Sequence, residues 1–378
     1  MADKPALVLG CGRSDQKDKA VDFYYSRWDT IPIMTDSIAT VAVVGAGPIG
    51  LELAVALKQK GVDYLHFDAK QIGHTISWFA PQTRFFSSNE RIAIAGVPLI
   101  TFDQNKATRE EYLAYLRLVV KLHDLKIRTY EPITDIRKRD SVFELTTAPR
   151  GGCHPRYRAK SVVLVTGGTD KPKMLNIPGE DLPHVSHYFQ DPHQYFNQRL
   201  LIVGGKNSAV EAALRCYHAG AEVSLSYRKE KLPEESIKYW LMPEIAAFIK
   251  AKKIDAFFST TPVKIGGDYV TLRRDGELFD VPADFVLLLT GYVQDETLLK
   301  MAGVEMTEDE QHCPKFNNDT METNVPGLYV AGTATAGTQS RYRVFIENCH
   351  VHVDRIVKAI TGEKSGATEN VVYAQPES

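Results

Sequence analysis

The 378-residue sequence predicts an α/β fold in which one parallel-sheet unit is inserted into another. Two glycine-rich turns carry this prediction, at residues 45–50 and 204–209. Each follows a short apolar strand and opens an apolar, helix-spaced stretch. A strand that ends in a glycine turn also occurs twice, as SVVLVTGG at 161–168 and ADFVLLLTGY at 283–292. The repetition predicts two Rossmann-like, three-layer dinucleotide-binding domains.

The composition is that of an ordinary globular protein. Charged residues make up 24% of the chain, hydrophobic residues 44%, and the net charge is −2. This balance argues against nucleic acid or an anionic membrane as partner, and no apolar run reaches the ~18 residues that a membrane span needs. The cysteines show no CxxC pair and no metal-type spacing, so we expect a cytoplasmic protein without a metal site. The five cysteines are Cys11, Cys153, Cys216, Cys313 and Cys349.

The first glycine turn is predicted to bind a dinucleotide. Gly45, Gly47 and Gly50 have the spacing GxGxxG. This spacing permits a tight turn, lets the backbone approach a pyrophosphate and lets the helix pack closely on the strand. The next strand, YLHFDA, ends in Asp68, at the distance where an acid binds the two ribose hydroxyls. A helix N-terminus and an acid together favour a dinucleotide without a ribose phosphate, such as FAD.

The second glycine turn repeats this pattern with a different ending. Lys206 stands in place of the second glycine and Ala209 in place of the third. The strand after the helix ends in Tyr227, Arg228 and Lys229, which would bind a 2′-phosphate, so we expect NADPH here. A solvated basic turn is the alternative reading of Arg228 and Lys229. The turn consists of Gly204, Gly205, Lys206, Asn207, Ser208 and Ala209.

Two such sites in one chain indicate a flavin that exchanges electrons with a nicotinamide. We expect an FAD-binding domain split between residues 39–192 and 300–378, with an NADPH-binding domain, residues 198–296, inserted. Residues 1–38 are predicted to be an extension of unknown role. Thr108 and Glu111 form a capping box that predicts the start of an amphipathic helix in the first domain.

These motifs, in this order, resemble the flavoproteins of the thioredoxin-reductase type over residues 40–362. Within that class, RFFSSNERIAIAGVPLI, the stretch 202–214 and FIENCHVHV are similar to the bacillithiol disulfide reductase family. The resemblance implies FAD, NADPH, a small-molecule disulfide substrate, a homo-oligomer and a rotation of the NADPH domain during turnover. It assigns to FAD the residues Gly45, Ala46, Gly47, Pro48, Ile49, Gly50, Asp68, Thr166, Gly167, Gly332, Thr333, Val344 and Phe345, and to NADPH residues 204–209, Tyr227, Arg228, Lys229 and Gly291.

The sequence departs from its relatives at three places. Thioredoxin reductases carry a CxxC in the NADPH domain, and this chain has only Cys216 after the second turn. Relatives of the bacillithiol type tend to carry a cysteine after the proline of the first turn, where this chain has Ile49. A thiol at that helix N-terminus would have a lowered pKa and could attack a disulfide, whereas isoleucine cannot. Thr333 stands where many relatives have aspartate.

Hydride transfer from NADPH to flavin needs a stacked geometry and no protein acid or base. We expect a helix that begins near Arg343, with N–H groups near Val344 and Phe345 facing the flavin, and charge from Arg341 and Arg343. Cys349, next to His350, is the candidate catalytic thiol, and a packed, inert Cys349 is the alternative.

The leading hypothesis is therefore an FAD-dependent enzyme that passes electrons from NADPH to a disulfide of the bacillithiol type. A ferredoxin- or flavodoxin-NADP reductase, with a small electron-transfer protein as partner, needs no cysteine and is the runner-up. A flavin monooxygenase ranks third, because no FxGxxxHxxxY-like linker is present. A non-catalytic FAD redox sensor is the alternative from another class.

Overall fold

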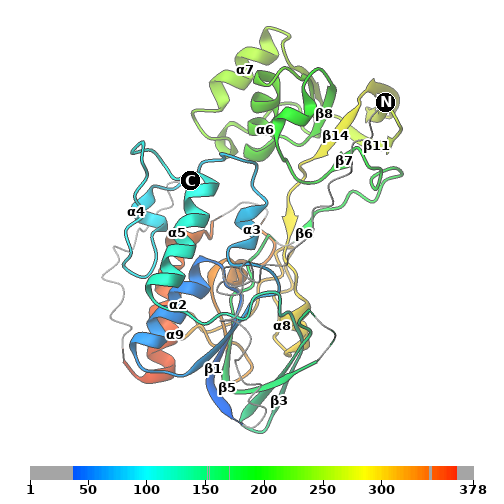
Figure 1. The fold of residues 1–378 in the computed structure, drawn as a ribbon. Coiled ribbons are helices and arrows are strands. Elements are labelled where there is room, and N and C mark those ends of the chain that lie inside the picture. The colour runs from blue at the N-terminus through cyan, green and yellow to red at the C-terminus, as the bar shows by residue number, and fades with distance from the viewer. Residues whose placement is uncertain (1–36, 151, 153, 170, 340–342, 364–378) are drawn as a thin grey trace, which may run out of the picture.

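The computed structural model describes residues 37–363, apart from 151, 153, 170 and 340–342. Figure 1 shows two units, a larger one that contains β1, β5 and α2, and a smaller one that contains β8 and α6. The predicted extension, residues 1–38, lies almost wholly outside the described residues, and Cys11, Cys153 and Arg341 lie outside them as well. Among the described residues, every helix is too short or too polar to span a bilayer.

The larger unit is built on a six-stranded mixed sheet in the order β2-β1-β5-β4-β3, with β16 also pairing with β5. The neighbours β1, β2, β5 and β16 run parallel, and β3 and β4 form an antiparallel arm. Because β16 follows the smaller unit in the chain, this sheet is assembled from both ends of the described sequence. The strands are β1 (Ile38–Val44), β2 (Tyr64–Phe67), β3 (Ile133–Arg139), β4 (Val142–Thr147), β5 (Arg156–Leu164) and β16 (Leu328–Val330).

Both faces of the first strand are buried. Val41 and Val43 pack toward helices α2 and α9, while Ala42 and Val44 pack in the core on the opposite face, near α8. A strand covered on both faces reads as a continuous apolar run, which the sequence VAVV shows. Helix α5 begins at the predicted capping box of Thr108 and Glu111. The helices of this unit are α2 (Pro48–Gln59), α3 (His74–Ser77), α4 (Asn89–Ile92), α5 (Arg109–Leu122), α8 (Thr297–Met301) and α9 (His350–Thr361), with 3-10 turns η3 (Gly332–Ala336) and η4 (Ile346–Asn348).

The smaller unit has a five-stranded parallel sheet in the order β10-β9-β8-β14-β7. A three-stranded antiparallel meander, β11-β12-β13, packs on one face of it. The strands are β7 (Val185–Ser186), β8 (Arg199–Val203), β9 (Glu222–Tyr227), β10 (Asp255–Phe258), β11 (Thr261–Ile265), β12 (Tyr269–Arg274), β13 (Glu277–Pro282) and β14 (Phe285–Leu288); the helices are α6 (Asn207–His218) and α7 (Met242–Lys250), with 3-10 turns η1 (Pro192–Tyr195) and η2 (Glu234–Ser236).

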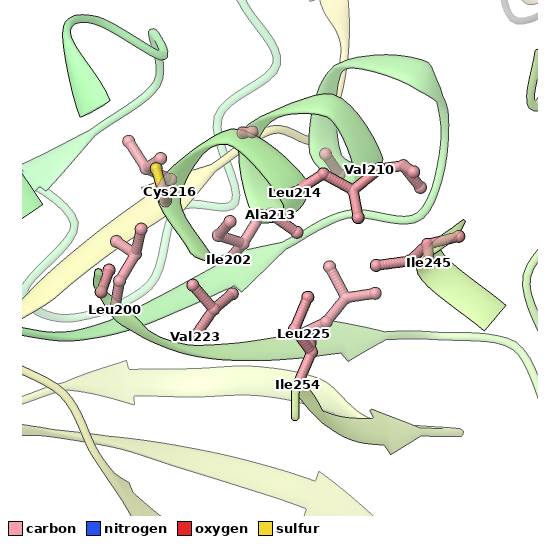
Figure 2. Packing of buried hydrophobic residues seen from close by; sticks show 14 of the residues in the cluster. Leu200, Ile202, Val210, Ala213, Leu214, Cys216, Val223, Leu225, Ile245 and Ile254 are labelled. Atoms are coloured by element: carbon pink, nitrogen blue, oxygen red, sulfur yellow. The ribbon is translucent and has the colours of Figure 1, made fainter. Parts of the chain in front are cut away.

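Figure 2 shows the core under α6, where Leu200 and Ile202 of β8 meet Val210 and Leu214 of the helix. The intervening residues of β8, such as Leu201, enter the core on the meander side. Each such fully buried aliphatic side chain contributes about 1.5–3 kcal/mol to stability. The prediction of two Rossmann-like domains, one inserted in the other, is confirmed.

Two chain crossings join the units, and they pair with each other as the short strands β6 (Lys171–Pro172) and β15 (Tyr292–Val293). The next strand, β7, lies before residue 192 and belongs to the smaller unit's sheet. The domain limits predicted at 192 and 198 therefore stay a prediction, and the pairing of β7 favours an earlier crossing near β6.

Candidate functional site

Both glycine turns open onto one cavity of about 1850 Å³ that runs between the units. Its wall takes in the first turn, the segments that follow β5 and β16, and the second turn. Sequence positions that are far apart are thus brought together at one site. Among the predicted FAD residues, Gly45, Gly47, Pro48, Ile49, Asp68, Thr166, Gly167, Gly332, Thr333, Val344 and Phe345 line this cavity, and among the predicted NADPH residues, Gly204, Gly205, Lys206, Asn207, Ser208, Ala209, Tyr227, Arg228 and Gly291 do so.

The first turn has the shape that a pyrophosphate requires. Gly45 has φ +116°, and a Cβ there would overlap the backbone O of Val165. A Cβ at Gly50 would overlap the backbone O of Gly45, so neither position accepts a side chain. Gly47 has no protein atom within 4 Å of where its Cβ would lie, so the open side of the turn faces the cavity. This cradle, at the N-terminus of α2, fits the phosphates of a dinucleotide.

Asp68 is held in place by a hydrogen bond from the first glycine turn. The N–H of Ala46 donates to its Oδ2 and the N–H of Lys70 donates to its Oδ1, both at 2.7 Å. Burial raises the pKa of Asp68, while these two amides and nearby His74 oppose the rise. A carboxylate has about four lone-pair sites, so two remain for a pair of ribose hydroxyls. Ala46 and Gly50 do not line the cavity themselves.

A second acid at the same end of the cavity was missed in the sequence. The Glu131 side chain is buried, and its Oε1 accepts hydrogen bonds from the hydroxyls of Thr147 and Tyr157, both at 2.8 Å. Its backbone N–H donates to the carbonyl of Asp68, which places it beside the predicted ribose site. No motif surrounds Glu131, and only the pairing of segments far apart in the chain reveals its place.

Ile49 is a packing residue at the first turn. It is buried in the core that α2 shares with β1, β5 and α9, and it also reaches the cavity. A Cβ built on Gly332 would lie 3.6 Å from the Cβ of Ile49, so the start of α2 and the segment after β16 are in contact. The position where relatives tend to carry a cysteine is therefore an apolar patch of the cavity wall.

The structure corrects the helix predicted to begin near Arg343, because α9 begins at His350. The side chain of Gln339 accepts the N–H groups of Arg343 and Val344, and Asn348 Oδ1 accepts the N–H of Phe345. These side chains accept the hydrogen bonds of backbone N–H groups that would otherwise be paired in a helix, so the segment forms a turn. The amides of Val344 and Phe345 are therefore engaged within the protein. Both residues line the cavity, and their contact with FAD stays a prediction.

Cys349 is the N-cap residue of α9, not a residue one and a half turns into a helix. Its side chain is fully buried, and burial, together with the charge of Glu52, raises the pKa of the thiol. His350 does not serve it as a base, because Nδ1 lies 2.8 Å from Glu52 and Nε2 lies 2.9 Å from the carbonyl of Arg91. Cys349 also lines the cavity, but its raised pKa and the engagement of His350 elsewhere favour the packed, inert alternative.

The second turn is shaped by the strands around it. Gly204 has φ +152°, and a Cβ there would lie 2.6 Å from the carbonyl O of Leu289. The ring of Tyr227 packs against Gly205 so closely that a Cβ would overlap it. Arg228 is exposed and lines the cavity, as a residue that meets a 2′-phosphate should. Lys229 is exposed and does not line the cavity.

A further segment of the cavity wall was not predicted to be part of the site, although its RFFS residues belong to the stretch that resembles the bacillithiol-type family. Residues 78–87 of the larger unit contribute aromatic side chains, among them Trp78, Phe85 and Phe86. Arg215 and Trp240 of the smaller unit contact this stretch. The resemblance covers Phe85 and Phe86 but assigns them no role, and their place at the cavity follows from the docking of one unit on the other.

Comparison with known proteins identifies the family of the chain. The family described as pyridine nucleotide-disulphide oxidoreductase matches residues 42–332. The bacilliredoxin reductase Bdr of Bacillus subtilis is 36% identical over 320 residues, covering 84% of this chain and 96% of that protein. A ferredoxin–NADP reductase of Ignicoccus hospitalis is 27% identical over 298 residues, covering 78% and 89%. The solved structure of bacillithiol disulfide reductase Bdr from Bacillus cereus is similar with a TM-score of 0.82 and 35% identity, covering 86% and 99%.

Proposed function

Because this chain belongs to the pyridine nucleotide-disulphide oxidoreductase family, we propose that it passes electrons from NADPH through FAD to a bacillithiol-type disulfide. It is an FAD- and NADPH-dependent oxidoreductase, so the alternative of a non-catalytic sensor is set aside. The observation that carries the proposal is the single cavity onto which both glycine turns open. FAD and NADPH would then be bound in the same cavity, which allows electron transfer between them.

We assign FAD to the first turn and NADPH to the second. Asp68 supports the first assignment, because an acid that binds ribose hydroxyls would repel a 2′-phosphate. Arg228 supports the second, and Lys229 adds positive charge beside it. Thr166, Gly167, Gly332 and Thr333 line the cavity between the turns, where the flavin ring would lie. Bound FAD would supply the two-electron chemistry, and the protein would supply its position and orientation.

No thiol among the described residues fits the role of a nucleophile. Cys349 and Cys216 are buried, and burial raises the pKa of each thiol. Burial also raises the pKa of the half-buried Cys313. We therefore propose that both thiols of the product come from the substrate. The disulfide would gain the electron pair of NADPH, one proton that originates in the hydride and one from solvent. Its S–S bond would break to give two thiols, NADP⁺ would leave, and no protein cysteine would be oxidised.

The ferredoxin-reductase alternative keeps one specific observation in its favour. Ile49 leaves the first turn without a thiol, and a reductase of a one-electron carrier needs none. The relative from Ignicoccus hospitalis has that printed activity, at lower identity than the Bacillus subtilis protein.

Anaerobic stopped-flow absorbance separates the two functions. The FAD-loaded protein is reduced with NADPH and then mixed with bacillithiol disulfide or with ferredoxin, while the visible flavin band is followed. Rapid reoxidation by the disulfide supports the proposal. Reoxidation by ferredoxin alone would replace it with the runner-up, and failure of NADPH to bleach the flavin would overturn both.

We also propose that the chain acts in the cytoplasm as a homo-oligomer. Leu118 and Leu122 lie one turn apart on α5 and are 53% and 62% exposed, which suits a contact between copies. Ile100 and Phe102 are exposed as well. Light scattering of the purified protein tests the oligomeric state.

A further inference from the structure

We propose that Arg215 is a positioning residue that docks the smaller unit on the larger one, so that the two glycine turns face each other across their common cavity. The inference rests on the proposed function, because it concerns the hydride that passes from NADPH to the flavin. Arg215 lies on α6, and the first residues of this helix form part of the second turn.

The guanidinium of Arg215 reaches out of its own unit. Nη1 donates to Oγ1 of Thr83 at 3.0 Å, and Nη2 donates to the backbone O of Pro81 at 2.5 Å. Within the smaller unit, the Cζ atom lies 5.2 Å from the centre of the Phe189 ring, which packs on that unit's core. A planar, forked side chain can make these contacts together, whereas a lysine cannot.

Glu211 completes the contact from one turn earlier on α6. Its carboxylate lies 3.6 Å from Nη1 of Arg215 and is hydrogen-bonded to the side chain of Thr83. Burial raises the pKa of Glu211, and the charge of Arg215 opposes that rise. Loss of Arg215 would leave the partly buried carboxylate of Glu211 without its counter-charge, which favours separation of α6 from the loop.

The contact connects two parts of the cavity wall. Ala80, Thr83 and Phe85 line the cavity from the larger unit, and residues 204–209 line it from the smaller one. Arg215 is eight positions after Asn207 on the helix, a rise of about 12 Å. Because a helix of this length is stiff, fixing its C-terminal half also fixes the turn at its start.

A second contact holds the smaller unit on the other side of the second turn. Oδ1 of Asn207 accepts the N–H of Lys238 at 2.8 Å. The ammonium of Lys238 lies 5.0 Å from the centre of the Phe86 ring, and the rings of Phe86 and Trp240 are 5.9 Å apart. Asn207 therefore ties the dinucleotide turn to a segment that packs on the larger unit.

Docking matters for the rate of the proposed reaction. With FAD held at the first turn and NADPH at the second, the flavin would accept a hydride from the dihydronicotinamide, and NADP⁺ would be left. A misplacement of 1 Å can slow such a step about 100-fold. Arg215 touches neither cofactor in this scheme and acts only through the placement of α6.

Arg215→Ala in the full-length, FAD-loaded protein tests the proposal. We expect flavin reduction by NADPH in a single turnover to slow about 10- to 100-fold. The NADPH dissociation constant should change little, because Arg228 and the turn remain. Small-angle X-ray scattering should show a larger radius of gyration than that of the wild type. Arg215→Lys should recover only part of the rate.

Arg199→Ala is the matched control, because Arg199 pairs with Asp284 inside the smaller unit at 2.6 Å. It should leave both the hydride-transfer rate and the radius of gyration unchanged. Should Arg215→Ala fail to fold, Thr83→Val removes one partner while keeping the loop's shape, and the same two measurements apply. If the radius of gyration and the rate of flavin reduction by NADPH are both unchanged in Arg215→Ala, or in Thr83→Val where that variant replaces it, the proposed role of Arg215 is overturned. If NADPH reduces no variant, the proposed function fails, and the scattering comparison alone still decides the docking role.

Discussion

The two glycine turns have the same plan and different surroundings. Around the first turn, the backbone O of Val165 and the carboxylate of Asp68 lie close to the glycines, and Ala46 and Ile49 are buried in the larger unit. Around the second, Tyr227 packs on Gly205, and Arg228 lies exposed at the cavity. A tightly enclosed turn suits a cofactor that stays bound, and an open, basic one suits a cofactor that exchanges. The difference between the two sites comes from the residues that end the following strand, Asp68 in one case and Tyr227 and Arg228 in the other, rather than from the glycines.

The largest effect should come from closing the first turn. Gly45→Ala would force a Cβ onto the carbonyl of Val165 at a positive φ, so we expect a loss of about 4 kcal/mol or more in unfolding free energy, and loss of FAD. Gly47→Ala is the control, because no protein atom lies within 4 Å of its Cβ. That variant should fold normally and bind FAD weakly. Thermal melts and the flavin absorbance per protein measure both, and a stable Gly45→Ala with full FAD would contradict the enclosed turn.

The larger unit should also be the acid-sensitive one. His66 lies behind the first turn, where its Nε2 is 2.9 Å from the carbonyl of Gly45, and burial lowers its pKa to about 4. The equivalent register position in the smaller unit holds Leu225. Because the folded pKa lies below the unfolded value of about 6.5, stability is lost as the pH falls from about 6.5 to about 4. The loss at the lower limit is about 3 kcal/mol.

His66→Leu removes this titration. The free energy of unfolding, measured by urea titration at several pH values, should fall less steeply in the variant between pH 6.5 and 4. Carboxylates titrate in both proteins, so the difference between the two curves isolates His66. Parallel curves would show that His66 already carries a proton in the native state.

Much of this comparison was readable in the sequence. GAGPIG and GGKNSA, each between an apolar strand and a helix, predict both turns, because glycine spacing is a local requirement of the backbone. The capping box of Thr108 was equally local. Glu131, Arg215 and the turn before α9 were not predicted, because each depends on partners far away in the chain. Gln339 and Asn348 replaced an expected helix by satisfying its amides, which helix propensity does not reveal.

The third prediction concerns Arg228, the exposed basic residue near the second turn. Arg228→Ala should weaken the preference for NADPH over NADH by about 2 kcal/mol, a factor of about 30. The change should come from NADPH alone, because NADH has no 2′-phosphate. The ratio of kcat/KM for the two nucleotides measures it. Lys229→Ala is the matched control, and its effect should be smaller, since Lys229 does not line the cavity. Equal effects of the two substitutions would mean that only net charge matters.

The smallest effect should come from the thiol beside the first turn. Cys349→Ala removes a buried sulfur whose pKa is raised by burial, so we expect turnover within about twofold of the wild type and a stability loss of about 1 kcal/mol. Ile49→Cys is the informative partner, because it places a thiol at the N-terminus of α2, where the pKa of a cysteine is lowered. That variant should become sensitive to alkylation after reduction with NADPH, whereas the wild type stays insensitive. Inactivation of the wild type by the same alkylation, with Cys349 as the labelled residue, would instead place a protein thiol in the reaction, and the two turns would then differ in chemistry as well as in charge.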